Sequence, residues 1–269
     1  MPTTNHGLTD RFSTPLCRKY LLAVFQDVHM KVGQEGEGVR SCAMRWGLGA
    51  LSDGQLELLG AWHRGEAEES LSARVSKDLQ LRGVEEVRFI AGLESSTGFE
   101  RAARVLCLDA DVLPSSGQLL QRVEIEMRAK DRHTASDCLA SFYRASTPER
   151  AEAAFSKFAD SPVGVKCPEL VERFRLSIQQ LSPFYASAPR IRRVVRNAEV
   201  ASRQLTRTLR QAIKRQDCFP SVEAATSFVT KALVRAEAHL SAFAPSPAAG
   251  PIKRAAAVGT RSFISAAGL

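Results

Sequence analysis

The chain has 269 residues, 44% of them hydrophobic, which is enough for one large domain or two modest ones with a buried core. Lys and Arg outnumber Asp and Glu by 37 to 29, so a polyanion is the first class of partner to consider. Six scattered cysteines form no Cys-x-x-Cys pair, which argues against a zinc site and indicates reduced thiols. The polar start at Met1–Phe12 and the absence of any stretch of about 18 apolar residues argue against a signal peptide and a membrane span, so we expect a cytoplasmic protein.

The first part of the chain predicts three strands. Tyr20–Phe25 is an apolar run that ends shortly before Asp27, as expected for a buried central strand that brings a side chain to a sheet edge. Val39–Leu51 and Gln55–Trp62 are joined by Ser52-Asp53-Gly54, whose Asp-Gly pair is a turn signal. These three strands are therefore expected to form an antiparallel meander.

Helices and strands then alternate. Glu68–Leu81 has helical spacing and ends near Gly83, a typical helix stop, and Val84–Leu93 has the composition of a fourth strand. A helix is expected at Gly98–Leu106 and a fifth strand at Leu119–Ile125. Three strands, helix, strand, helix and strand is the order of a ribonuclease-H-like α/β mixed sheet.

The remainder is predicted to be mostly helical. Thr147-Pro148-Glu149 is a strong helix start, because Thr can cap, Pro suits the first turn and Glu complements the helix dipole. Helices are expected at Glu149–Phe158, Pro168–Leu181, Glu199–Arg215 and Ser221–Phe243. The expected divisions are a polar lead (1–19), an α/β core (20–130), a helical insertion (131–186), C-terminal helices that return to the core (187–243), and a linker and tail (244–269).

One predicted helix has an unmixed basic face. Between residues 196 and 215 an apolar stripe consists of Ala198, Ala201, Leu205, Leu209 and Ala212. A solvated helix face normally mixes charges, because like charges one turn apart repel, yet the opposite face has five cations and no acid. Together with two cations upstream, the predicted DNA-binding residues are Arg192, Arg193, Arg196, Arg203, Arg207, Arg210 and Lys214. Such a row would contact DNA phosphates without reading base sequence.

Several short strings occur in the order and spacing found in the mutator-type insertion-sequence transposases. They are Asp27–Val32, Leu58–Trp62, Asp78-Leu79, Leu81–Val84, Gly98-Phe99, Arg207–Arg210, Lys214, Phe219–Ser221, Glu223–Ala225 and Pro251–Lys253. On these strings the chain resembles that family over roughly residues 20 to 260. The resemblance implies a ribonuclease-H-like catalytic domain interrupted by a helical insertion, and DNA as the partner.

The resemblance also implies an Asp-Asp-Glu triad that holds two Mg²⁺ ions, which stabilise the attacking and leaving oxygens of phosphoryl transfer. Asp27 occupies the first acidic position, and the second falls on Glu94 or, with a one-residue slip, on Leu93. The third position falls on Arg203, and Glu199 lies one turn earlier. The predicted catalytic residues are therefore Asp27, Glu94 and Glu199, with Asp27 and Glu94 as metal ligands.

Other departures from the family pattern indicate a truncated and drifted copy. Val123–Glu126 stands where the family has Cys-x-x-His, and only 19 residues precede Tyr20, where the family has a long helical region. Gly47-Leu48-Gly49 lacks the third glycine of a dinucleotide loop, which excludes a nucleotide-cofactor enzyme. We therefore expect a transposase that binds DNA, assembles on it as a homodimer or larger oligomer, and cuts it with metal ions if still active. The alternative is a non-catalytic DNA-binding relic or an interaction protein.

Overall fold

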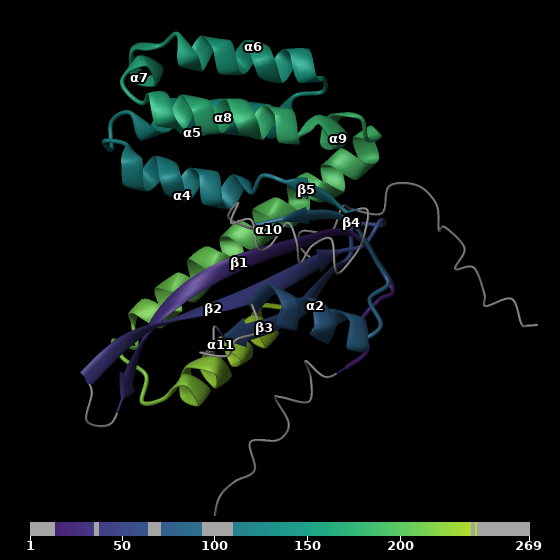
Figure 1. The fold of residues 1–269 in the computed structure, drawn as a ribbon, viewed down its shortest axis with the longest axis vertical. Helices are drawn as coiled ribbons and strands as arrows, with labels where there is room; N and C mark the ends of the chain where they lie inside the picture. Colours follow the sequence, from purple (N-terminus) through teal and green to yellow (C-terminus); the bar gives the residue numbers. More distant parts are fainter. Residues whose placement is uncertain (1–13, 35–37, 64–70, 93–109, 238–239, 241–269) are drawn as a thin grey trace, which may run out of the picture.

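The computed structural model describes residues 14–34, 38–63, 71–92, 110–237 and 240. The strands there are β1 (Lys19–Gln34), β2 (Gly38–Ala50), β3 (Leu56–His63), β4 (Glu86–Ala91) and β5 (Asp111–Leu113). They form one sheet in the order β3-β2-β1-β4-β5, in which β1, β2 and β3 are antiparallel while β4 and β5 run parallel to β1 (Figure 1). This mixed sheet with its helices confirms the predicted α/β class.

The helices are α2 (Leu71–Leu81), α4 (Ser116–Glu126), α5 (Arg132–Arg144), α6 (Pro148–Ala159), α7 (Pro162–Val165), α8 (Pro168–Gln180), α9 (Ser182–Tyr185), α10 (Pro189–Lys214) and α11 (Val222–Glu237). Helices α4 to α9 stack beyond one edge of the sheet, and α10 runs from them back across it (Figure 1). The helix α6 begins as predicted, because the Thr147 hydroxyl accepts a hydrogen bond from the backbone N–H of Arg150.

The turn between β2 and β3 is the predicted one. The backbone N–H of Gly54 donates to Leu51 O at 2.9 Å, and Gly54 has a φ of +96°, a conformation that a residue without Cβ adopts at little cost. The Asp53 carboxylate accepts a further hydrogen bond from the backbone N–H of Gln55 at 2.9 Å. Local residue types therefore determine this hairpin.

The central strand β1 has two different faces, because successive side chains of a strand point to opposite sides. Val28 and Met30 pack against Leu205 and Leu209 of α10. Phe25 belongs to the cluster on the other side, which includes residues of α2. From residue 27 onward the α2 face of β1 is partly open, whereas the α10 face stays buried. This alternation decides where the predicted site residues of β1 point.

The predicted fifth strand at Leu119–Ile125 is wrong, because these residues lie in the helix α4. Ser115 caps that helix, and Val123 is its buried apolar residue, with Leu119 and Leu120 packed nearby at helical spacing. The actual fifth strand, β5, has three residues, which is too short for an alternation pattern to reveal. The Leu119–Ile125 segment has the composition of a strand but the spacing of a helix.

One apolar cluster joins the sheet to the helical part of the chain. It contains Leu22 and Phe89 from the sheet together with Phe142, Phe174 and Phe184 from helices α5, α8 and α9. Burial of large aromatic side chains is a major stabilising contribution. The division of the chain at residues 130 and 186 stays a prediction.

Three expectations fall on residues that the structure does not describe: the helix at 98–106, the linker and tail at 244–269 and the acid Glu94. Within the described ranges, no helix is both long enough and apolar enough to span a membrane.

Candidate nucleic-acid interface

The helix α10 is amphipathic over its whole length of 26 residues. Pro189 stands in its first turn, where the missing N–H costs nothing. The buried stripe contains Ala198, Ala201, Leu205 and Leu209 as predicted, and it continues to Ile213, whereas Ala212 is half-buried. Packing of this stripe on the sheet turns the opposite face outward.

The predicted DNA-binding cations of α10 fall into two groups. Arg193, Arg207, Arg210 and Lys214 are exposed, and Arg203 is half-buried. Arg192 and Arg196 instead contact backbone carbonyl groups. Arg192 Nη1 donates to Tyr185 O at 2.9 Å and to Ser187 O at 2.8 Å, and Arg196 Nη1 donates to Tyr143 O at 3.4 Å. These two arginines therefore join α10 to the helical part of the chain through one guanidinium nitrogen each, and their contact with DNA stays a prediction.

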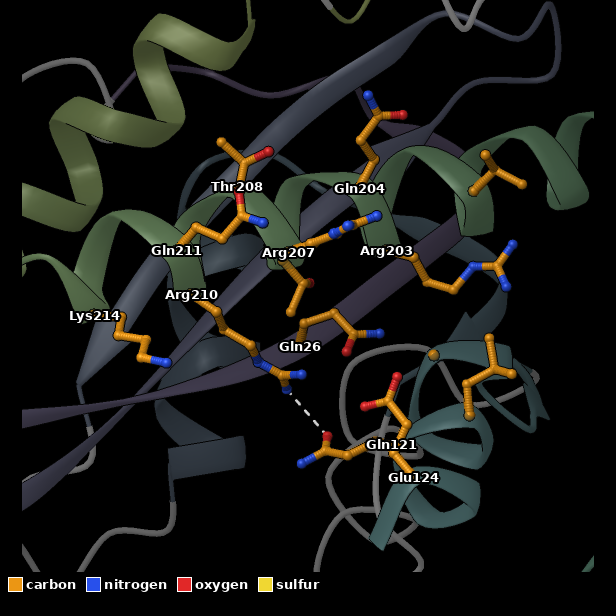
Figure 2. Close-up of a pocket in the computed structure, with 14 residues that line it drawn as sticks. Gln26, Gln121, Glu124, Arg203, Gln204, Arg207, Thr208, Arg210, Gln211 and Lys214 are labelled. Atoms are coloured by element: carbon orange, nitrogen blue, oxygen red, sulfur yellow. Dashed lines mark hydrogen bonds between the residues drawn. The ribbon is translucent and has the colours of Figure 1, made fainter. Parts of the chain in front are cut away.

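Four of these cations line a groove of about 1150 Å³ between α4 and α10, whereas Arg193 lies outside it. Arg203, Arg207, Arg210 and Lys214 are on the α10 wall. The α4 wall includes Leu120, Gln121 and Glu124, and Gln26 of β1 lies between the two walls (Figure 2). Arg210 Nη2 bridges the groove by donating to Gln121 Oε1 at 3.0 Å. Among the described lining residues four are cations and one is an acid, so the groove favours an anion.

At the inner end of the groove a cluster of polar residues joins β1, α4 and α10. Gln26 is 4% exposed, and its Nε2 donates to Ser115 Oγ at 3.2 Å. A Cβ atom on Gly117 would lie 3.1 Å from Arg203 Cγ and 3.4 Å from Gln26 Nε2. Glycine at this position therefore leaves room for Arg203 and Gln26 to lie side by side.

The carboxyl group of Glu199 is buried beside this cluster, with 3% of the residue exposed. Ser116 Oγ donates to its Oε2 at 2.5 Å, and Oε1 has no hydrogen-bond partner among the described residues. Burial raises the pKa of Glu199 above 4.5, although the Ser116 hydroxyl and the Arg203 charge act in the opposite direction. Glu199 is thus enclosed by protein rather than open to the groove.

The carboxylate of Asp27 lies on the other face of the sheet from Glu199. It forms a two-pronged ion pair with Arg45, in which Arg45 Nε and Nη2 donate to the two carboxylate oxygens at 2.8 Å each. Asp27 follows Gln26 in β1, and Gln26 faces α4 and α10, so Asp27 faces the α2 side. The structure does not bring Asp27 and Glu199 together.

These positions do not fit a shared Mg²⁺ site. A magnesium ion needs oxygen ligands at about 2.0–2.1 Å, and carboxylates on opposite faces of a sheet cannot meet that requirement. The described part of the chain contains no group of three or more His, Cys, Asp or Glu side chains that could hold a metal ion. We therefore derive no metal-dependent step from Asp27 and Glu199, and Glu94 lies outside the described residues.

Four residues of the polar cluster were not predicted from the sequence: Gln26, Ser115, Ser116 and Gly117. A signal for Gln26 was present, because it is in phase with the apolar residues Val28, Met30 and Val32, whereas Asp27 is in phase with the polar residues His29 and Lys31. No comparable local signal exists for the serines and Gly117. Their role depends on the approach of α10, more than 70 residues further along the chain.

Comparisons with known proteins assign the family. The model of the family described as "Transposase, Mutator family" matches residues 8–241. The chain therefore belongs to the Mutator family of transposases. It is 29% identical over 211 residues to a transposase for insertion sequence element ISRM3 of Rhizobium meliloti (strain 1021), which is 78% of this chain and 52% of that protein. It is also 29% identical over 186 residues to a probable insertion-sequence transposase of Corynebacterium diphtheriae, covering 69% of this chain and 53% of that protein. The chain spans about half the length of these relatives.

Proposed function

We propose that this Mutator-family chain binds the DNA backbone through the cations of the α4–α10 groove, and that Asp27, Glu94 and Glu199 do not form a metal-dependent cutting site in it. The observation that supports DNA binding is the α10 wall, where Arg203, Arg207, Arg210 and Lys214 face a groove with Glu124 as its one acid among the described lining residues. Cations in such a row neutralise phosphates and release counterions.

The expected binding is independent of base sequence and sensitive to salt. Each phosphate contact contributes about 0.9 to the slope of log affinity against log salt concentration for duplex DNA. Arg207, Arg210 and Lys214 are exposed, so their replacement leaves the core intact. Replacing all three with Ala is expected to reduce the slope by about 3.

Fluorescence anisotropy with a labelled duplex of about 30 base pairs and arbitrary sequence, titrated at NaCl concentrations from 50 to 300 mM, measures this slope. The matched control is the triple variant Arg150→Ala, Lys157→Ala and Arg173→Ala, which removes three exposed cations from α6 and α8. An equal reduction of the slope in the two triple variants would mean that net charge, and not this groove, determines DNA affinity.

The proposed absence of cutting by these acids rests on the separation of Asp27 from Glu199 across the sheet. Supercoiled plasmid incubated with the protein and Mg²⁺ is expected to stay intact, since Asp27 and Glu199 lie on opposite faces of the sheet. Agarose gel electrophoresis detects any nicked product. Nicking that disappears in Asp27→Ala would contradict the proposal and restore metal-dependent transposition.

Assembly on DNA and a cytoplasmic location stay predictions from the sequence.

A further inference from the structure

We propose that Arg203 and Gln26 form a metal-independent binding site for one DNA phosphate at the inner end of the α4–α10 groove. The site deepens the proposed DNA binding and rests on it. In the family resemblance, position 203 belongs to a metal-binding carboxylate. In this chain a guanidinium takes that place and supplies the positive charge that a divalent cation would otherwise supply.

The donors at this point are suited to a phosphate oxygen. Arg203 lines the groove and makes no salt bridge or side-chain hydrogen bond to the described residues, so its five N–H donors are open to a ligand. One N–H of the Gln26 side-chain amide donates to Ser115 Oγ, and the second N–H of the same nitrogen is not needed for that bond. The aliphatic stem of Arg203, at Cγ, and the Gln26 amide both lie beside Gly117, so a turn of the Arg203 side chain about that stem would let both side chains donate to one anion.

The fixed charges near Arg203 favour the same ligand. Ser115 caps α4, so the positive end of the α4 dipole, at Ser116 and Gly117, lies beside Arg203 and Gln26. Glu199, one turn before Arg203 in α10, is buried and bonded to Ser116, and burial disfavours its charged form. Glu124 lies on the α4 wall of the groove. The guanidinium of Arg203 therefore lacks a close paired carboxylate among the described residues.

A divalent cation is poorly suited to the same position. Mg²⁺ prefers carboxylate and other oxygen ligands, whereas this cluster consists of a guanidinium, a primary amide and hydroxyl groups. An ion beside Arg203 would also be repelled by its charge. Phosphate binding here is therefore expected to persist when divalent ions are removed.

The test measures the affinity of the full chain for the same labelled duplex in EDTA and in MgCl₂ at equal ionic strength. Affinity in EDTA is expected to equal or exceed that in MgCl₂.

Arg203→Ala is expected to weaken binding about tenfold, because a charge-assisted hydrogen bond to phosphate contributes at least about 1.4 kcal/mol. Arg203→Lys, which keeps the charge and the aliphatic stem beside Gly117, is expected to lie between the parent and Arg203→Ala. Lys157→Ala, which removes one exposed cation from α6, is the control for net charge and is expected to retain parental affinity.

Loss of binding in EDTA would overturn the proposal, as would parental affinity in Arg203→Ala. If Arg203→Ala does not fold, as judged by circular dichroism, parental affinity in Arg203→Lys overturns it instead. Weaker binding by the triple variant of Arg207, Arg210 and Lys214 with no effect at Arg203 would reject this phosphate site but retain the proposed DNA binding. Parental affinity both in Arg203→Ala and in the triple variant would reject the phosphate site and the proposed DNA binding together.

Discussion

The buried carboxyl group of Glu199 shows how a single residue can oppose folding at neutral pH. Its neighbours include the Ser116 hydroxyl, the phenol of Tyr143 and the charge of Arg203, and burial is the largest cause of its raised pKa. Burial likewise raises the pKa of Tyr143 well above 10.0, so this phenol stays neutral. A carboxyl group that ionises more readily in the unfolded chain destabilises the fold as pH rises.

Glu199→Gln is expected to change how stability depends on pH. Below about pH 4.5 the carboxyl group is protonated in both states, so the parent and variant should have similar free energies of unfolding. Above that pH the unfolded parent gains from ionisation while the folded parent stays protonated, so the parent loses stability until the pH passes the raised pKa. The variant should therefore become progressively more stable than the parent.

Urea denaturation of both proteins at intervals from pH 4 to pH 8 measures this difference. Gln can still accept the hydrogen bond from Ser116 through its amide oxygen, which makes it a close substitute. A difference in free energy that does not change with pH would contradict the expected burial of an ionisable Glu199.

At the scale of the element, α4 links its own stability to the geometry of the groove. The Ser115 hydroxyl accepts from the backbone N–H of Gln118 at 3.5 Å as an N-cap and from Gln26 Nε2 at 3.2 Å. The same residue thus begins the helix and orients the buried amide on β1. One side chain satisfies two donors in this way because the N-terminus of α4 meets the α10 face of the sheet.

Ser115→Ala is expected to reduce the free energy of unfolding by about 1–2 kcal/mol, because it removes the cap and leaves a Gln26 donor buried without that partner. Thr147→Ala is the matched control, since Thr147 caps α6 at the same distance of 3.5 Å but is exposed. Thr147→Ala should reduce the free energy of unfolding by about 0.5–1 kcal/mol. Thermal or urea unfolding measures both, and equal losses would mean that the bond to Gln26 contributes nothing.

Across the whole molecule, the apolar cluster that contains Leu22, Phe89, Phe142 and Phe174 joins the sheet to helices α5 and α8. A continuous cluster of this kind couples the unfolding of its parts, because neither part keeps its buried surface without the other. The arrangement also positions α10, whose Arg192 and Arg196 are bonded to carbonyls of the helical part.

Phe174→Ala is expected to destabilise the sheet as well as the helices, by about 3–5 kcal/mol. Trp46 and Trp62 lie on β2 and β3, so tryptophan fluorescence during urea unfolding reports on the sheet, far along the chain from the substitution. Leu176→Ala is the control on the same helix, since Leu176 is 47% exposed, and should change stability by less than about 0.5 kcal/mol. An unchanged tryptophan transition in Phe174→Ala would mean that the helical part unfolds independently.

Sequence patterns alone were sufficient for features that depend on neighbouring residues. The turn at Asp53-Gly54, the cap at Thr147 and the apolar stripe of α10 each involve residues within a few positions of one another, and the structure confirms all three. The α/β class and the family resemblance are also confirmed. Local chemistry determines such features because turns, caps and periodicity act over one or two turns of chain.

Only the tertiary structure decided what each side chain of the candidate site meets. It turned Gln26 rather than Asp27 toward α10, used the donors of Arg192 and Arg196 on backbone carbonyls, and made residues 119–125 part of a helix. The bonds of Gln26 and Arg196 join residues 89 and 53 positions apart in the chain, and the direction of Asp27 depends on strand register and on which face is buried. A one-residue change of phase in β1 moves a carboxylate to the opposite face of the sheet. The apolar residues Val28 and Met30 indicate that phase, and their packing against α10 determines which elements each face meets.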